Sequence, residues 1–173
     1  MSFLFESERL RFRETTPQDA QAMFDLNSDV DVLKYTGDQP FSSVQEAQKF
    51  LANYTDFKKN GMGRWAVVRK VDHAILGWCG LKLHPEGFVD LGYRLQRKYW
   101  SLGFATEASL ACLAYGFNTL RLKEIVARSV PENKASIRIM EKCGMTFSHK
   151  SFDELHNQEI VIYTITNENF SRH

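Results

Sequence analysis

Gly103 and Ala105 stand two residues apart in the segment from Leu91 to Ala108, which has the pattern of a strand, a short loop and the start of a helix. The first amides of a helix have no partner inside the helix and lie at the positive end of its dipole, so they bind anions. The segment lacks the Lys-Ser or Lys-Thr of the ATPase phosphate loop and the three spaced small residues of a dinucleotide site. The pattern alone leaves two interpretations open, a phosphate site and an ordinary strand-to-helix turn.

Further residues able to do chemistry are Asn133, Ser136, Asp90 and His84. Asn133 and Ser136 open an expected helix, and because Asn is a favoured N-cap, both can be explained by capping alone. Asp90 lies in an expected strand, where it can be a surface residue or an ion-pair partner. His84 could accept a proton near pH 7, but a lone histidine beside a proline in a turn is more often a solvated loop residue.

Hydrophobic periodicity predicts the elements that must position these residues. Strands are expected at residues 10–13, 65–68, 74–83, 88–95, 124–129 and 159–166, and helices at residues 20–26, 104–118 and 134–142. Another helix, opened by a capping box at Ser43 and Glu46, is expected to end at Asn60-Gly61. The strands from 65 to 95 form a predicted antiparallel meander, followed by helix, strand, helix and strand. This order predicts one mixed α/β domain over residues 1–173, with a central sheet open on at least one side.

Composition agrees with a single globular domain, since 43% of the residues are apolar and 25% are charged. A domain of about this length buries roughly 70% of the surface that its unfolded chain exposes. A net charge of +1 does not provide the broad positive field that binds nucleic acid, so no nucleic-acid partner is expected. No run approaches the roughly 18 apolar residues of a membrane span, and no signal peptide is apparent, so we expect a cytoplasmic protein without a membrane partner.

The cysteines Cys79, Cys112 and Cys143 are odd in number and fall in expected strand and helix segments. A disulfide framework is therefore not expected. None of the three has a histidine at zinc-ligand spacing, which predicts no metal site. None has an obvious histidine partner, so a covalent cysteine intermediate is not expected either.

Five short motifs are distributed over nearly the whole chain. They are Ser7 to Arg13 followed by Asp19, Asp90-Leu91-Gly92-Tyr93, Tyr99-Trp100 through Glu107-Ala108, Asn133-Lys134-Ala135-Ser136, and Glu141 to Met145. Together they resemble the GNAT superfamily of acyl-CoA-dependent N-acetyltransferases, in particular its RimJ/RimL-like branch, which acetylates the N-termini of ribosomal proteins. The superfamily loop has Gln or Arg, two residues, Gly, one residue, then Gly or Ala. Gly103 and Ala105 match this pattern, whereas Trp100 stands where Gln or Arg is usual.

The resemblance implies a mixed, mostly antiparallel sheet that splays at the cofactor site, flanking helices, and acetyl-CoA (coenzyme A) as cofactor. It implies that Trp100 contacts the cofactor and that the pyrophosphate is bound by the amides of the loop residues Ser101, Leu102, Gly103, Phe104, Ala105 and Thr106. It also implies that backbone groups of Leu95 and Arg97 pair with the pantetheine arm, in the way that an added strand pairs with a sheet edge. This pairing requires the sheet to open after the strand at residues 88–95.

The resemblance further implies that Asn133 approaches the cofactor and that the Ser136 hydroxyl protonates the departing thiolate. Many members use a tyrosine four residues after the serine for this proton, and here Met140 occupies that position. Because a thiol pKa near 8.5 makes the thiolate a fair leaving group, Ser136 or a water is sufficient. We therefore expect Met140 to contribute to packing more than to chemistry.

Attack on a thioester requires a neutral amine. An α-amine with a pKa near 8 is partly neutral at pH 7, whereas a lysine with a pKa of about 10.4 is almost wholly charged. Where a base is needed, the resemblance indicates Asp90 acting through a water, with Glu154 and Glu159 near the last hairpin as further candidates.

The predicted function is N-acetyl transfer by direct attack of a protein N-terminal or small-molecule amine, with an amide near Leu95 stabilising the oxyanion. A non-catalytic acetyl-CoA-binding sensor or assembly module is the alternative. Residues 31–41 are expected to line the acceptor pocket and show no clear charge pattern, so they do not identify the amine. By analogy with the superfamily, a homodimer is the expected assembly.

Overall fold

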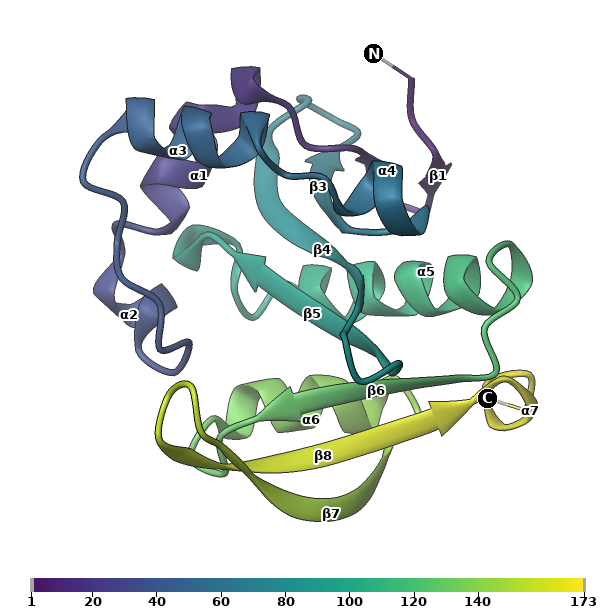
Figure 1. Ribbon diagram of the computed structural model, residues 1–173. Helices are drawn as coiled ribbons and strands as arrows, with labels where there is room; N and C mark the ends of the chain where they lie inside the picture. The colour runs from purple at the N-terminus through teal and green to yellow at the C-terminus, as the bar shows by residue number, and fades with distance from the viewer. Residues whose placement is uncertain (1, 173) are drawn as a thin grey trace.

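Eight strands form one sheet in the computed structural model, which describes residues 2–172 (Figure 1). Within this range all neighbouring strands are antiparallel except β5 and β6, which are parallel, and the order is β1-β2-β3-β4-β5-β6-β8-β7. The strands are β1 (Phe5–Glu6), β2 (Leu10–Arg13), β3 (Arg64–Arg69), β4 (Ile75–Leu83), β5 (Val89–Leu95), β6 (Glu124–Ser129), β7 (Thr146–Asp153) and β8 (Gln158–Thr166). The predicted mixed, mostly antiparallel α/β fold is confirmed.

The sheet opens between β5 and β6. Strand β5 pairs with β4 along its whole length, but it pairs with β6 only at Asp90↔Val126 and Leu91↔Ala127. The two strands lie together on the right of Figure 1 and diverge toward the left. The predicted splay is therefore present, and it begins inside β5 rather than after its end.

Helices cover both faces of the sheet. They are α1 (Ala20–Leu26), α2 (Val30–Leu33), α3 (Val44–Ala52), α4 (Asp56–Asn60), α5 (Phe104–Asn118), α6 (Lys134–Lys142) and α7 (Asn167–Phe170), with 3-10 turns η1 (Pro17–Asp19) and η2 (Arg97–Tyr99). Helix α5 packs on β4 and β5 and is the crossover that connects the parallel strands β5 and β6. None of the helices in the described range is long and apolar enough to cross a membrane.

Adjacent residues of β4 show that the helices form two layers. Trp78 packs with the apolar side chains of α1 and α3, whereas Cys79 belongs to the main core with those of α5. Successive side chains of a strand point to opposite faces, so the α1–α3 layer and the α5–α6 layer lie on opposite sides of the sheet. Cys79, Cys112 and Cys143 are buried free thiols.

The helix expected to run from Ser43 to Asn60-Gly61 is divided in two, and this prediction was wrong in extent. Ser43 caps α3 as predicted, its hydroxyl accepting from Glu46 N–H at 3.2 Å. The helix ends at Ala52 and a second one, α4, ends at Gly61 in the left-handed conformation, with φ of +68°. Asn53 and Thr55, which have low helix propensity, stand between the two helices.

Strand β7 was not predicted. All of its side chains except Asp153 are exposed, so the alternation of apolar and polar residues that marks a half-buried strand is missing. It lies at the edge of the sheet and pairs with β8 from Thr146↔Thr164 to Asp153↔Gln158. Backbone pairing with β8, rather than side-chain burial, determines its conformation.

Candidate functional site

A cleft of about 630 Å³ lies where β5 and β6 diverge. Of the residues predicted for the site, Asp90, Leu95, Trp100, Ser101, Gly103, Phe104, Ala105, Thr106, Asn133 and Ser136 line this cleft. Arg97 and Leu102 are not among its lining residues. The Arg97 guanidinium instead pairs with Asp31 at 2.6 Å and with Asp29 at 3.3 Å. The structure thus brings together ten of the predicted residues, from three separate parts of the chain.

The free edge of β5 presents backbone groups to the cleft. Gln96 N–H donates to Leu76 O at 2.8 Å, and along an antiparallel pair only alternate residues exchange such bonds. The N–H and C=O groups of Tyr93 and Leu95 therefore point away from β4, toward the gap beside β6. The Leu95 carbonyl accepts from the Trp100 indole Nε1 at 2.8 Å, which leaves its N–H directed at the cleft.

The loop before α5 turns the helix N-terminus toward the same cleft. Ser101 and Gly103 have left-handed backbones, with φ of +59° and +80°. Gly103 is the N-cap of α5, and its carbonyl accepts from Glu107 N–H at 3.0 Å. The amides from Phe104 to Thr106 therefore have no partner inside the helix and lie at the positive end of the dipole of a 15-residue helix. This is the arrangement expected of an anion site.

A contact between the N-terminal segment and α5 holds this loop in place. The Glu107 carboxylate accepts from Ser7 Oγ at 2.7 Å, from Arg9 N–H at 2.7 Å and from Arg9 Nε at 2.6 Å. The Arg9 guanidinium lies 4.2 Å from the Phe104 ring centre and donates to Leu102 O at 3.1 Å. Although burial disfavours its charge, the bonds from Ser7 and Arg9 hold the pKa of Glu107 below its usual range. Leu102 thus supports the loop through its carbonyl without lining the cleft.

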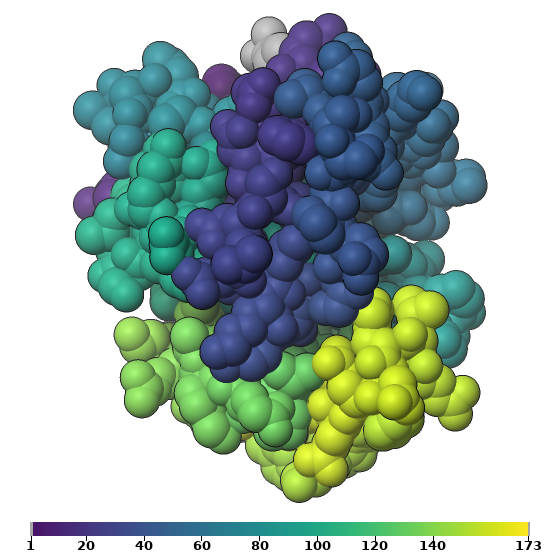
Figure 2. Space-filling view, turned by 90° about the vertical axis from the view of Figure 1, so that its left-hand side faces the viewer, coloured from purple at the N-terminus to yellow at the C-terminus, as the bar shows by residue number. Residues whose placement is uncertain are grey.

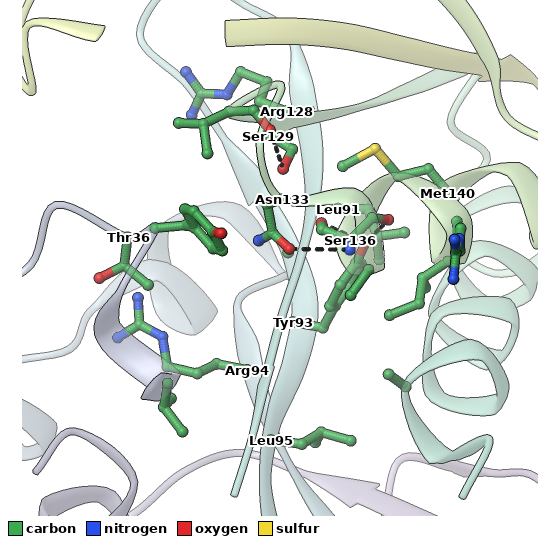
Figure 3. Close-up of a pocket in the computed structure, with 18 of the residues that line it drawn as sticks. Thr36, Leu91, Tyr93, Arg94, Leu95, Arg128, Ser129, Asn133, Ser136 and Met140 are labelled. Atoms are coloured by element: carbon green, nitrogen blue, oxygen red, sulfur yellow. Dashed lines mark hydrogen bonds between the residues drawn. The ribbon is translucent and has the colours of Figure 1, made fainter. Parts of the chain in front are cut away.

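The first turn of α6 places a hydroxyl pair opposite the loop. Asn133 Oδ1 accepts from Ser136 N–H at 3.2 Å, so the predicted N-cap is confirmed. Tyr93 Oη donates to Ser136 O at 2.9 Å and lies 3.0 Å from Ser136 Oγ, an arrangement visible in Figure 3. Burial raises the pKa of Tyr93 well above its usual range, so its hydroxyl keeps its proton. Met140 is almost fully buried and forms part of the wall.

Asp90 lies beside two guanidinium groups and an imidazole on the opposite face of β5. Its carboxylate is 2.9 Å from Arg64 Nη2, 3.1 Å from His84 Nε2 and 3.3 Å from Arg128 Nη2. Burial alone would raise its pKa, but Arg64, His84 and Arg128 together hold the pKa of Asp90 well below its usual range. Gly92 permits this arrangement, since a Cβ there would lie 2.7 Å from the Arg64 Cζ. Asp90 is therefore ionised at neutral pH and is a weak proton acceptor.

The other acidic candidates lie near the last hairpin. Glu154 and Glu159 are exposed and are not among the lining residues, and Glu159 pairs with Lys150 at 3.1 Å. Asp153 and His156, from the same hairpin, do line the cleft. Asp153 Oδ2 lies 2.8 Å from His156 Nδ1. The hairpin thus contributes a carboxylate–imidazole pair to the site, but through residues other than those predicted.

Helix α2 and the loop after it close the cleft on the side away from α6. In Figure 2 this dark blue segment extends over the green and yellow C-terminal half. The His156 ring lies so close to Gly37 that a Cβ there would be 2.2 Å from its Cδ2 atom. Tyr35 packs against Val130 and Ile160, which gives this end of the cleft an apolar wall.

Besides Asp153 and His156, the sequence also failed to indicate Tyr93, Arg64 and Arg128 as site residues. Tyr93 had a usable signal, because it shares the alternate positions of β5 with Leu91 and Leu95 and therefore faces α6. Arg64 and Arg128 had no such signal in the sequence, because they are 26 and 38 positions from Asp90. Only the pairing of β3, β4, β5 and β6 brings them close to it.

Comparisons with known proteins agree with this geometry. Residues 9–146 match the family model described as an acetyltransferase (GNAT) domain. The chain is 33% identical over 137 residues to the uncharacterized N-acetyltransferase p20 of Bacillus licheniformis, covering 78% of this chain and 77% of that protein. A GNAT-family acetyltransferase from Bacillus anthracis has a similar structure, with a TM-score of 0.81, 28% identity, and coverage of 94% of this chain and 98% of that one. Spermidine N-acetyltransferase from Vibrio cholerae, solved with CoA and spermine, has a TM-score of 0.81 at 18% identity, covering 95% and 99% of the two chains, and shows the fold alone.

Proposed function

The chain belongs to the GNAT acetyltransferase family and is an acyltransferase, and from this premise we propose that it transfers an acetyl group from acetyl-CoA to a primary amine by direct attack. The observation that carries the proposal is the opening between β5 and β6, where free strand backbone and the N-terminus of α5 face one cleft. Such an opening accepts an extended ligand with amide groups at one end and phosphates at the other.

The residues of the cleft have the chemistry that acetyl-CoA requires. The amides of residues 101–106, at the start of α5, are suited to its pyrophosphate, and the free N–H and C=O groups of Tyr93 to its pantetheine amides. When bound, acetyl-CoA supplies the acetyl group as a thioester, which an amine can attack. The N–H of Leu95 faces the cleft and can donate to the oxygen on which negative charge develops.

Ser136 Oγ is the proposed proton donor to the departing sulfur. Tyr93 Oη lies 3.0 Å from this hydroxyl and positions it, while Asn133 holds the backbone of the same turn. A hydroxyl fixed in this way contributes by orientation, and a thiolate needs only weak acid assistance to leave. Cys79, Cys112 and Cys143 are not among the residues that line the cleft, which supports direct transfer without an acyl-cysteine.

The acceptor is proposed to be an α-amine, of a protein N-terminus as in the RimJ/RimL-like branch or of a small molecule. The low pKa of Asp90 makes it a weak base, so an acceptor that is partly neutral by itself is favoured. An α-amine meets this requirement near neutral pH, whereas a lysine side chain does not. Asp90 is therefore proposed to position Arg64 and Arg128 rather than to accept the proton.

Two measurements on the purified protein test the proposal. A thermal-shift titration with acetyl-CoA, with NAD and ATP as controls, should show a saturable rise for acetyl-CoA alone, because a ligand of the folded state raises the melting temperature. Thiol release in the presence of amines should then show turnover. No shift at millimolar acetyl-CoA would overturn the cofactor assignment, and a shift without thiol release would favour a binding module instead.

A further inference from the structure

We infer that the acceptor amine carries a carboxylate group, and that Arg128 binds this group at the acceptor end of the cleft. The inference rests on the proposed function and defines its acceptor class. Arg128, from β6, lines the cleft, and in Figure 3 its guanidinium lies on the same side of Asn133 as Thr36, away from Ser136 and Met140. An acceptor held there has its amine free to reach the thioester side.

The charge of this region is the first reason. Asp90 is the single carboxylate shared by two guanidinium groups, those of Arg64 and Arg128. The pair formed by Arg64 and Asp90 is the shorter, at 2.9 Å, and both of these side chains are well buried. Because one negative charge faces two positive ones in a partly desolvated site, the cluster retains a net positive charge that favours an anionic ligand.

The unused hydrogen-bonding capacity of Arg128 is the second reason. Its contacts with Asp90 and His84, at 3.3 Å and 3.2 Å, both use Nη2. Its Nε is buried and has no hydrogen-bond partner in the described part of the chain. The Nη1 group of Arg128 carries two further N–H donors, and neither has a hydrogen-bond partner among residues 2–172. Because Nε is buried, a ligand meets Arg128 at the accessible part of its guanidinium, where a carboxylate can accept a charge-assisted hydrogen bond from Nη1.

The remaining charges argue against a polyamine. A polyamine needs free carboxylates, but Asp31 already pairs with Arg97 at 2.6 Å, and Asp153 with His156 at 2.8 Å. The other wall is apolar, with Tyr35 packed against neighbouring aliphatic side chains. The cleft is therefore suited to a molecule that combines an amine, a carboxylate and an apolar portion.

Matched acceptor pairs test the inference. Thiol release is measured with L-leucine and L-phenylalanine and with their carboxamides, with spermidine, and with short peptides that differ only in Asp or Asn at the second position. The acids should exceed their amides by about 10- to 100-fold in kcat/KM, the range expected for a hydrogen bond to a charged group. A carboxamide has the more readily deprotonated amine, so amine basicity cannot produce this preference. The amino acids test a carboxylate on a small molecule, and the peptides test a side-chain carboxylate near a protein N-terminus.

Variants then assign the effect to Arg128. Arg128→Gln should remove the preference for acids mainly by raising their KM, and Arg128→Lys, which keeps the charge but holds it less rigidly, should retain part of it. Arg11→Gln removes a positive charge from β2, outside the lining residues, and should change nothing. Stabilisation by acetyl-CoA is recorded for each variant, so that a folding or cofactor defect is recognised, and Arg128→Lys serves if Arg128→Gln does not fold.

The outcomes separate this inference from the proposed function. Equal or faster turnover of the carboxamides or of spermidine would overturn the inference and leave the transferase proposal intact. An acid preference that persists in both Arg128 variants would overturn the role of Arg128. Failure of every amine to release thiol, with acetyl-CoA stabilisation intact, would overturn both proposals.

Discussion

Tyr93→Phe removes one hydroxyl from a buried pair, and its effect can be estimated from the contacts. Tyr93 Oη contacts Ser136 O at 2.9 Å and Ser136 Oγ at 3.0 Å. Ser136 O also lies within α6, where the N–H of Met140 reaches it in the helical pattern, so the substitution leaves no acceptor without a partner. We therefore expect a loss of only about 0.5–1.5 kcal/mol in the free energy of unfolding, the usual contribution of one hydrogen bond.

The effect on turnover should be comparable in free energy to this modest stability change. Without Tyr93 Oη, Ser136 Oγ is free to occupy about three staggered rotamers, so kcat should fall about threefold or more. Ser136→Ala removes the proposed donor itself and should lower kcat by about 10²-fold, the low end for acid catalysis, because a thiolate leaves readily. Since Tyr93 acts through Ser136, the double variant should be no slower than Ser136→Ala.

Steady-state thiol release and urea unfolding measure these quantities. Tyr163→Phe is the matched control, because its hydroxyl contacts Glu141 at 3.4 Å and Tyr163 is not among the residues lining the cleft. If Tyr93→Phe slows Ser136→Ala by the same factor as it slows the wild type, the two hydroxyls act independently and the reasoning is refuted.

Three further substitutions probe the supports of the site. Glu107→Gln should raise the KM for acetyl-CoA several-fold with little change in kcat, because it weakens the contact that holds the loop to Arg9; an unchanged KM in steady-state kinetics would contradict this. Gly92→Ala should destabilise the fold by about 1–3 kcal/mol in urea unfolding, since its Cβ displaces the Arg64 guanidinium, and wild-type stability would show that Arg64 moves freely. Asp90 has a lowered folded-state pKa, so its stabilisation is present above its unfolded pKa of about 3.8 and is lost as the pH falls toward the folded value. The melting-temperature gap between wild type and Asp90→Asn should therefore narrow below about pH 4, and a constant gap would contradict the assignment.

The local sequence pattern was sufficient to predict the helices and strands that have a strong hydrophobic periodicity or a clear boundary residue. The expected helices at residues 104–118 and 134–142 and the strand at 124–129 coincide with α5, α6 and β6. Each of these has either a cap residue at its start or alternating burial along its length. Strand β7 was missed because its stability comes from pairing with β8, which its own exposed side chains do not reveal.

The residues of the site likewise fall into those that a local sequence pattern indicates and those that only the tertiary structure brings together. Gly103 and Asn133 are local signals, because a left-handed turn and an N-cap are properties of a few consecutive residues. The partners of Asp90 come from β3 and β6, and their proximity depends on sheet order and register. Asp90 does line the cleft, but the surrounding arginines disfavour the expectation that it acts as a base.

The two halves of the cleft offer different groups to their proposed ligands. On the cofactor side the groups available are backbone amides and carbonyls of β5 and of the start of α5. These groups are present whichever side chains most of the residues carry. On the acceptor side the available groups are side chains such as Arg128 and Tyr35, contributed by segments far apart in the sequence. A motif therefore identifies the cofactor more readily than the amine. By the same reasoning, a single substitution at Arg128 should change the choice of acceptor while leaving the binding of acetyl-CoA intact.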